Sequence, residues 1–286
     1  MWYNRQQQGQ GEITAVKKWI RRELLVLAAV TVVIACATVP VTERRQLRLI
    51  PRSELLAMSF SQYDQFLSDN PVISGTPEAR MVERVGSRIA NAVQQYMSEI
   101  GREQDLRGYN WEFRLVDDEA VNAWCMPGGK VVVYSGILPV TSTETGLAVV
   151  MGHEVAHAVA EHGNERMSQA LMTQFGGAAL SAAMRDRPEE TRNLWLAAYG
   201  LGTQVGVLLP YSRLHESEAD ELGLIFMAMA GYDPREAVDF WQRMADARGG
   251  PAPPELVSTH PADSRRIRDL ERALPRALEY YQAALR

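Results

Sequence analysis

The spacing of apolar residues divides the chain into helical and strand-like segments. Between residues 51 and 100, apolar side chains recur every three or four positions, as at Val82 and Val85, which predicts two amphipathic helices. Short β-branched and aromatic runs replace this pattern over about residues 110–136, where they flank a Pro-Gly-Gly turn signal and predict a small sheet. From Thr143 onward the spacing is helical again. The chain is therefore expected to form an α+β, mostly helical domain.

A long uncharged stretch interrupts the amphipathic pattern in the C-terminal half. No side chain from Asn193 to Ser212 is charged, and a charged break at 185–192 separates this run from a glycine- and alanine-rich stretch before it. Ala198, Gly202 and Gly206 recur every four residues, so one helix face is small enough for close approach. We expect a helical hairpin packed into the domain, because the run contains Gly, Gln and Asn. Its length would also allow it to span a bilayer, which is the alternative.

The N-terminal region carries the features of a targeting segment. Basic residues between Lys17 and Arg22 precede an uncharged, mostly apolar run from Leu24 to Thr42. The most apolar part ends at Cys36 in a Val-Ile-Ala-Cys sequence, which resembles the lipobox of bacterial lipoproteins, where the cysteine is lipidated. We expect a signal peptide over 1–35 and a lipid anchor on Cys36, while Ala37 favours the outer membrane. An uncleaved membrane anchor and a soluble helix are the alternatives.

Composition and charge narrow the possible function classes. Of the 286 residues, 46% are apolar and 23% charged, which is typical of a folded protein. The formal net charge of -5 argues against a nucleic-acid partner, because nucleic-acid-binding domains usually carry a basic excess. The two cysteines, Cys36 and Cys125, allow at most one disulfide. If Cys36 carries lipid, Cys125 is expected to be a buried structural thiol.

A His-Glu-x-x-His sequence at residues 153–157 is the strongest chemical signal in the chain. His153 and His157 are four positions apart, so they share one helix face and both imidazoles can bind one metal ion. Glu154 follows the first ligand and can reach the water-filled fourth position. The motif predicts one Zn²⁺ per chain, with Glu154 as a catalytic residue.

A second helix, expected over 213–231, offers the third ligand. Glu216 and Asp220 are again four residues apart. This spacing places one carboxylate toward the metal and the other where it can accept the free N–H of a ligand histidine. Glu218 is the rival ligand, but the apolar stripe of this helix favours an outward direction for Glu218 and Glu221.

The remaining histidines fall outside the ligand set. His162 is rotated off the ligand face of its helix and is expected at a helix end. His215 is expected to be a solvated or capping side chain. His260 lies in a loop with the sequence Ser-Thr-His-Pro.

Four sequence features together resemble metallopeptidase family 48, the gluzincins that include the CAAX prenyl protease and the HtpX heat-shock protease. They are HExxH at 153–157, Glu-x-x-Ala-Asp at 216–220, Asn-Ala-Trp-Cys-Met-Pro-Gly-Gly before a strand at 130, and Ser-Thr-His-Pro at 258–261. The resemblance covers about 77–270. It is greatest to the bacterial periplasmic lipoprotein branch, which is related to the mitochondrial inner-membrane quality-control protease.

The resemblance implies a zincin-type metallopeptidase domain over 77–286, preceded by a linker and helix over 36–76. In the family, the two histidines of HExxH and the first glutamate of ExxAD hold zinc, which assigns Glu216 as the third ligand beside His153 and His157. The resemblance also places the strand at 130 beside the HExxH helix, where its edge would pair with an extended peptide. An ordinary core strand is the alternative.

The expected reaction is hydrolysis of a peptide bond by zinc-bound water, with Glu154 moving the proton from water to the leaving amine. His260 is the candidate for stabilising the oxyanion, or else it occupies the open position and silences the enzyme. Tyr211 and Arg213 are weaker candidates for the oxyanion.

We therefore expect a membrane-anchored zinc endopeptidase of the bacterial cell envelope, on the outer membrane facing the periplasm. Its expected partners are misfolded or damaged envelope proteins and, through the lipid, a membrane. One alternative is a periplasmic chaperone or assembly factor with a structural or latched zinc. Another is an integral membrane processing protease, which requires 193–212 to span the bilayer. The substrate, the cleavage preference and the oligomeric state stay open.

Overall fold

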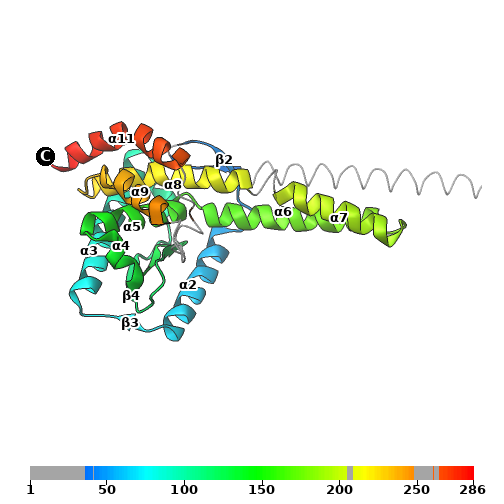
Figure 1. Cartoon of the computed structure of the whole chain (residues 1–286), viewed down its shortest axis with the longest axis horizontal. Helices are drawn as coiled ribbons and strands as arrows, with labels where there is room; N and C mark the ends of the chain where they lie inside the picture. The colour runs from blue at the N-terminus through cyan, green and yellow to red at the C-terminus, as the bar shows by residue number, and fades with distance from the viewer. Residues whose placement is uncertain (1–35, 41, 205–208, 248–259, 261–263) are drawn as a thin grey trace, which may run out of the picture.

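Helices surround a small mixed sheet in the body of the molecule (Figure 1). The computed structural model describes residues 36–40, 42–204, 209–247, 260 and 264–286. The predicted signal peptide lies outside these residues. The helices are α2 (Arg52–Asp69), α3 (Pro77–Glu99), α4 (Leu138–Thr141), α5 (Glu144–Val159), α6 (His162–Ala183), α7 (Glu189–Thr203), α8 (Leu209–Met229), α9 (Glu236–Ala247) and α11 (Ser264–Ala284). The strands are β1 (Cys36–Thr38), β2 (Arg45–Leu47), β3 (Val72–Ile73), β4 (Glu112–Val116), β5 (Ala123–Met126) and β6 (Lys130–Tyr134). The predicted α+β, mostly helical fold is confirmed.

The main sheet has the strand order β3-β4-β6-β5. β4 and β6 are parallel, and the two outer strands pair with them in antiparallel fashion. The expectation that β6 offers an edge is therefore wrong, since β6 lies between β4 and β5. The turn at Gly128 and Gly129, both with positive φ, folds β5 back along β6 and makes β5 the edge strand, packed beside α5.

The core lies between α3, α5 and α8. Thr76 caps α3 by accepting a hydrogen bond from the backbone N–H of Ala79, and Val82, Val85 and Ile89 of the same helix are fully buried, as their spacing predicts. α5 is buried on almost every side and packs against α8. The helix that carries HExxH is thus the centre of the body rather than a surface element.

The contact between α5 and α8 is close because two glycines face each other. A Cβ atom on Gly223 would lie 3.0 Å from the backbone nitrogen of His153, and one on Gly152 would lie 3.0 Å from the carbonyl oxygen of Gly223. These neighbours are backbone atoms, so a side chain at either position would push the helices apart. The approach brings the carboxylates of α8 within reach of the histidines of α5.

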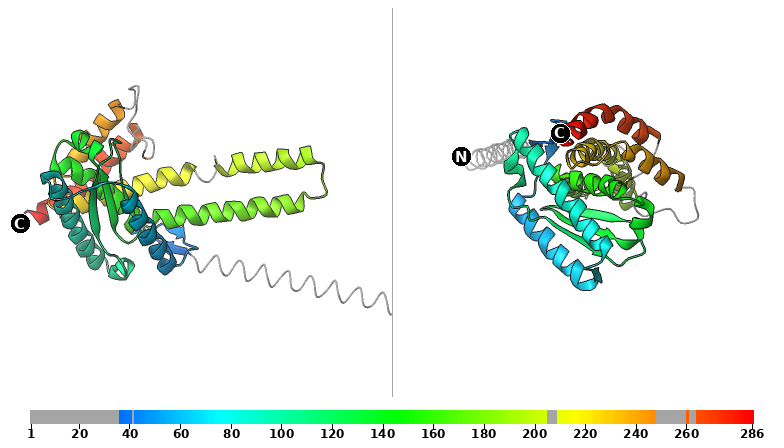
Figure 2. Two further views of the ribbon diagram at one scale, coloured as in Figure 1. Left: turned by 90° about the horizontal axis from the view of Figure 1, so that it is seen from below. Right: turned by 90° about the vertical axis from the view of Figure 1, so that its left-hand side faces the viewer.

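α6 and α7 form a helical hairpin that extends away from the body (Figure 2). The hairpin predicted from the sequence is confirmed, but the expectation that it packs into the domain is wrong. Its helices pack on each other, with the Tyr199 hydroxyl donating a hydrogen bond to the carbonyl oxygen of Thr173. Gly176 therefore serves contact within the hairpin, since a Cβ atom on it would lie 2.1 Å from the Tyr199 hydroxyl oxygen.

A membrane span is not found among the described residues. No described helix combines the length and the apolar composition that crossing a bilayer requires.

Candidate metal centre

α5 presents the HExxH motif to the interior of the body. Thr143 caps the helix by accepting a hydrogen bond from the backbone N–H of Gly146. His153, Glu154 and His157 are all buried. Three polar side chains on an otherwise apolar buried helix need polar partners, and these come from α8, α11 and the loop at His260.

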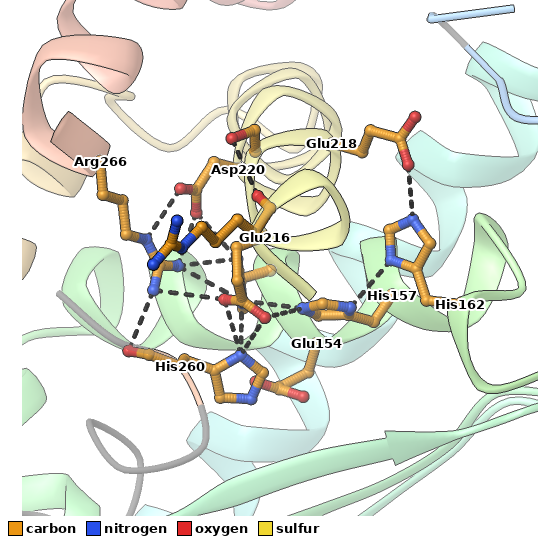
Figure 3. A network of polar contacts seen from close by, with 11 residues as sticks. Glu154, His157, His162, Glu216, Glu218, Asp220, His260 and Arg266 are labelled. Atoms are coloured by element: carbon orange, nitrogen blue, oxygen red, sulfur yellow. Dashed lines mark hydrogen bonds and ion pairs between the residues drawn. The ribbon is translucent and has the colours of Figure 1, made fainter. Parts of the chain in front are cut away.

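The Glu216 carboxylate points toward His157 and His260 (Figure 3), and His153 belongs to the same group of possible metal ligands. The Nε2 atoms of His153 and His157 are 3.1 Å apart, and each lies 3.3 Å from a different oxygen of the Glu216 carboxylate, Oε2 for His153 and Oε1 for His157. Ligand atoms at the usual zinc distances of about 2.0–2.1 Å are about 3.3–3.4 Å apart along the edges of a tetrahedron. The separations between these three side chains are therefore close to those of a tetrahedral zinc site, with the Glu216 carboxylate facing both imidazoles.

Asp220 lies against the other nitrogen of His153. Its Oδ1 atom is 2.9 Å from Nδ1, so an Nδ1–H donates to the carboxylate and leaves the Nε2 lone pair free for a metal. Asp220 is held by Arg266 of α11, whose Nε and Nη2 atoms donate to its two oxygens at 2.8 and 2.6 Å. The guanidinium also lies over the ring of Trp241, 3.4 Å from its centroid.

His157 receives matching support from His162. The two Nδ1 atoms are 2.9 Å apart, and Nε2 of His162 is 3.0 Å from an oxygen of Glu218. Burial lowers the pKa of His162 to about 4, so it is neutral near pH 7. Because its Nε2–H donates to Glu218, its Nδ1 accepts from His157, which leaves Nε2 of His157 free for a metal.

The outward direction expected for Glu218 is wrong. Glu218 is buried and accepts hydrogen bonds from Thr42 and from Arg44, which come from the segment between β1 and β2. Burial raises its pKa, but the hydrogen bonds from His162, Arg44 and Thr42 outweigh burial and lower it to about 2. The apolar stripe of α8 could not predict the contacts with Thr42 and Arg44, because these residues lie far from α8 in the sequence.

Arg44 also pairs with Glu165 of α6, with Nη2 2.7 Å from the carboxylate. Glu165 in turn contacts His215 at 2.9 Å. His215 is therefore buried, and the expectation of a solvated or capping side chain is wrong. These side chains connect the N-terminal strand pair, α6 and α8 behind the metal centre.

The corner between α5 and α6 sets the position of His162. Glu161 adopts a left-handed backbone conformation with φ of 55°, which is uncommon for a residue other than glycine. Its carboxylate is 2.7 Å from Arg48. The expected helix-end position of His162 is correct, since it begins α6, but the residue is fully buried and contacts His157.

His260 is the fourth member of the group formed with His153, His157 and Glu216. Its Nδ1 lies 2.9 Å from Glu216 and 3.1 Å from Nε2 of His153, and its Nε2 lies 3.3 Å from Oε1 of Glu154. Although burial opposes ionisation of Glu216, its close contacts with His153, His157 and His260 hold its pKa well below the usual range. Oε1 of Glu154 is buried and makes no hydrogen bond to a described residue.

Among the weaker candidates, the backbone of Tyr211 lies on α8 but its side chain lies outside the described part of the structure. Arg213 is exposed. Burial raises the pKa of the Cys125 thiol, which lies on the edge strand β5, well above its usual value. The structure thus brings His153, Glu154, His157, Glu216, Asp220 and His260 together. Sequence reasoning missed Arg44 and Arg266, because arginines carry no spacing signal that links them to a distant motif.

The sequence matches known proteins in this region. The model for Peptidase family M48 matches residues 87–274. Mitochondrial metalloendopeptidase OMA1 of Schizosaccharomyces pombe is 35% identical over 244 residues, which are 84% of this chain and 66% of that protein. The Saccharomyces cerevisiae protein of the same name is 36% identical over 62% of this chain and 51% of that protein. The beta-barrel assembly-enhancing protease of Escherichia coli is 28% identical over 56% of this chain and 33% of that protein.

The matched parts span about half to two thirds of the two OMA1 relatives. The family model covers most of the described body, from α3 to α11, and therefore includes every side chain of the metal centre. The chain belongs to peptidase family M48.

Proposed function

We propose that this protein is a zinc-dependent endopeptidase. The observation that carries the proposal is the convergence of His153, His157 and Glu216, whose separations match the edges of a tetrahedral zinc site. Family M48 is zinc-dependent, and the two OMA1 relatives are named metalloendopeptidases. We assign these three residues as the ligands of one Zn²⁺ per chain and Asp220 as the residue that orients His153.

Zinc bound there would lower the pKa of a coordinated water and polarise the scissile carbonyl. Glu154 then holds the proton of the attacking water on its carboxylate and delivers it to the leaving amine nitrogen. Glu154 suits this role because it is buried beside the proposed ligands, and the contact of its Oε1 atom with Nε2 of His260, 3.3 Å away, does not have hydrogen-bond geometry that would have to be broken first.

His260 supports two readings of the fourth position. Its Nε2 faces Glu154, where it would stabilise an oxyanion, and its Nδ1 belongs to the ligand-like group, where it would take the place of water. The second reading favours a latched zinc and therefore the alternative function of a chaperone or assembly factor with little proteolysis. Replacing His260 with Ala separates them, because a stabiliser predicts slower cleavage and a latch predicts faster cleavage.

The edge strand β5 supports the binding of extended peptides. It lies beside α5 and pairs only on its inner side with β6 among the described strands. A substrate backbone added along β5 would be recognised by its extended shape rather than by its sequence, which suits misfolded proteins.

We place the protein in the bacterial cell envelope, held to the membrane, most specifically the outer membrane facing the periplasm, by a lipid on Cys36. The lipobox-like sequence supports this placement, and so does the name of the Escherichia coli relative, which refers to β-barrel assembly. Misfolded or damaged envelope proteins are the proposed substrates. Metabolic labelling with an alkyne fatty acid tests the anchor: wild type should be labelled and a Cys36→Ser variant should not.

The test of the peptidase is hydrolysis of casein, a disordered substrate, by the full chain and by Glu154→Gln. We expect Glu154→Gln to keep one zinc per chain and to lose about 10²–10⁴-fold in rate, as is usual for loss of a general base. Glu144→Gln, at the start of the same helix, is the control and should cleave normally. Undiminished cleavage by Glu154→Gln would refute the mechanism. A wild-type chain that prevents aggregation but never cleaves would favour the chaperone.

A further inference from the structure

The hairpin of α6 and α7 is not used by the peptidase centre. We propose that its projecting part, residues 170–204 and here called the arm, lies on the surface of a lipid bilayer with its apolar side chains in the outer hydrocarbon region. The proposal rests on the membrane attachment proposed above but assigns a second and separate contact.

The arm exposes large apolar side chains to an unusual degree. None of its described side chains is buried. Of the ten exposed large hydrophobic side chains among the described residues, five lie on the arm: Met172, Phe175, Leu194, Trp195 and Leu201. Leu194 is 71% exposed and Phe175 is 67% exposed. A concentration of apolar surface of this kind on one projection indicates a binding surface rather than scattered exposure.

All charged side chains of the arm lie at its tip, within residues 185–192. No side chain is charged from Met167 to Met184 or from Asn193 to Ser212. Each of these two runs is bounded on both sides by an arginine: Arg166 and Arg185 for the first, Arg192 and Arg213 for the second. Apolar helices bounded by arginines match a bilayer surface, because guanidinium groups pair with lipid phosphates while Trp and Leu enter the hydrocarbon.

The position of the arm base supports lipid as the occupant. Cys36, the proposed lipid attachment site, is the first residue of β1, where it pairs with Leu47 of β2. β2 packs on the start of α6, and the backbone N–H of Leu49 donates to Ser168 of that helix at 2.9 Å. No flexible linker therefore separates a lipid on Cys36 from the base of the arm, and the bilayer surface must lie close to that base.

The arm would lie along the membrane rather than cross it. No described helix is long and apolar enough to span, and the tip between α6 and α7 carries six charged side chains at residues 185–192. With one acyl anchor site and one apolar arm, the body would be held in a fixed orientation on the membrane, since two attachments restrict rotation that a single tether allows.

A photo-crosslinking experiment on the full chain tests the occupant. The photoreactive residue p-benzoylphenylalanine is placed at Leu201 or, as a control, at Leu285, in cells whose lipids carry an alkyne tag. Both side chains are 65% exposed, but Leu285 lies at the C-terminus, at the other end of the molecule (Figure 1). We expect lipid crosslinks from position 201 that exceed those from position 285 by about tenfold.

Three outcomes would overturn the proposal: crosslinks between two copies of the chain, crosslinks to another protein, or equal lipid crosslinking at both positions. A second variant guards against misfolding. Leu194→Glu should reduce lipid crosslinking from position 201 while cleavage of casein in solution stays within about twofold of wild type, because exposed residues contribute little to stability. Lipid crosslinking without any casein cleavage would refute the proposed peptidase but not the arm contact. Casein cleavage without lipid crosslinking would refute the arm contact but not the proposed peptidase.

Discussion

α6 belongs to two regions that invert the usual distribution of side chains. Its first turns, next to the metal centre, bury polar and charged residues: His162, Asn164, Glu165, Ser168 and Gln169. Beyond Ala170 nothing described on the helix is buried, and the exposed side chains include Met172 and Phe175. Burial of charge is costly unless partners are fixed, whereas exposure of apolar surface is costly unless something covers it. The buried polar side chains of the first region are therefore stabilised by partners within the chain. The exposed apolar side chains of the second region indicate a partner outside the chain.

The largest effect on the buried polar region is expected when Arg44, the arginine that pairs with the buried carboxylates of Glu165 and Glu218, is removed. Arg44→Met should destabilise the protein by about 3–5 kcal/mol, because Glu165 and Glu218 would remain buried without their cation. Chemical denaturation of the metal-free protein measures this difference. An effect below 1 kcal/mol would mean that the network behind the metal centre contributes little.

The ion pair of Arg44 with Glu165 predicts that the stability of the protein depends on pH. Although burial raises the pKa of Glu165, hydrogen bonds from Arg44 and His215 outweigh it and lower the pKa below its ordinary value of 4.5. A lowered pKa stabilises the folded state above 4.5, and that contribution is lost as the pH falls through the folded value. The difference in unfolding free energy between wild type and Arg44→Met should thus be largest near pH 7 and shrink below pH 4.5. A difference that grew on acidification would contradict the assignment.

A smaller effect is expected from the partner of His153. Asp220→Asn should weaken zinc binding by about 10–100-fold, because an amide at this position no longer fixes the ligand histidine. Competition with a zinc-binding dye measures the affinity. Asp269→Asn on α11 is the control, since Asp269 pairs only locally with the neighbouring Arg272 and Arg265 in the described structure. Equal affinities for the two variants would remove Asp220 from the metal centre.

The close helix contact gives an effect of about the same size or less. Gly223→Ala should destabilise the fold by about 1–3 kcal/mol, because the new methyl group would meet the backbone of His153. Thermal denaturation compares it with Gly163→Ala, where a Cβ atom would meet nothing within 4 Å. If Gly163→Ala were the more harmful of the two, the spacing of α5 and α8 would not depend on these glycines.

The smallest stability effect is expected in the arm. Leu201→Ser should change the free energy of unfolding in solution by no more than about 0.5 kcal/mol, because the side chain is largely exposed. Phe226→Ala, in the core, should cost about 3–5 kcal/mol under the same conditions. Comparable losses for both would show that the arm is part of the folding core.

Local spacing explains which parts of the site could be predicted. His153 and His157 share a helix face by their spacing alone, and the register of Glu216 with Asp220 follows from the same rule. The helices at 52–69 and 77–99 and the sheet at 112–134 also lie where apolar patterns and turn signals place them. The roles of these site residues stay predictions until zinc and activity are measured.

Contacts between distant segments explain what could not be predicted. Glu218 is expected to face outward because the apolar stripe of its own helix lies on another face, and its partners Thr42 and Arg44 precede it by more than 170 residues. β5 rather than β6 is the edge strand, because β4 pairs with β6 and thereby places β6 inside the sheet. Local sequence does not show which strand β4 pairs with. The hairpin is expected inside the domain because the Gly, Gln and Asn of residues 193–212 argue against a membrane span, and this composition does not say which surface covers the apolar side chains.

The measurement that tests the central claim most directly is the zinc content of purified Glu216→Gln by native mass spectrometry. The full chain should carry one zinc ion, and Glu216→Gln should lose it, because two histidines alone leave the tetrahedral site without its carboxylate. Glu221→Gln is the matched control on α8, since its carboxylate pairs with Arg276 away from the centre, and it should keep one zinc. One zinc retained by Glu216→Gln would contradict the account.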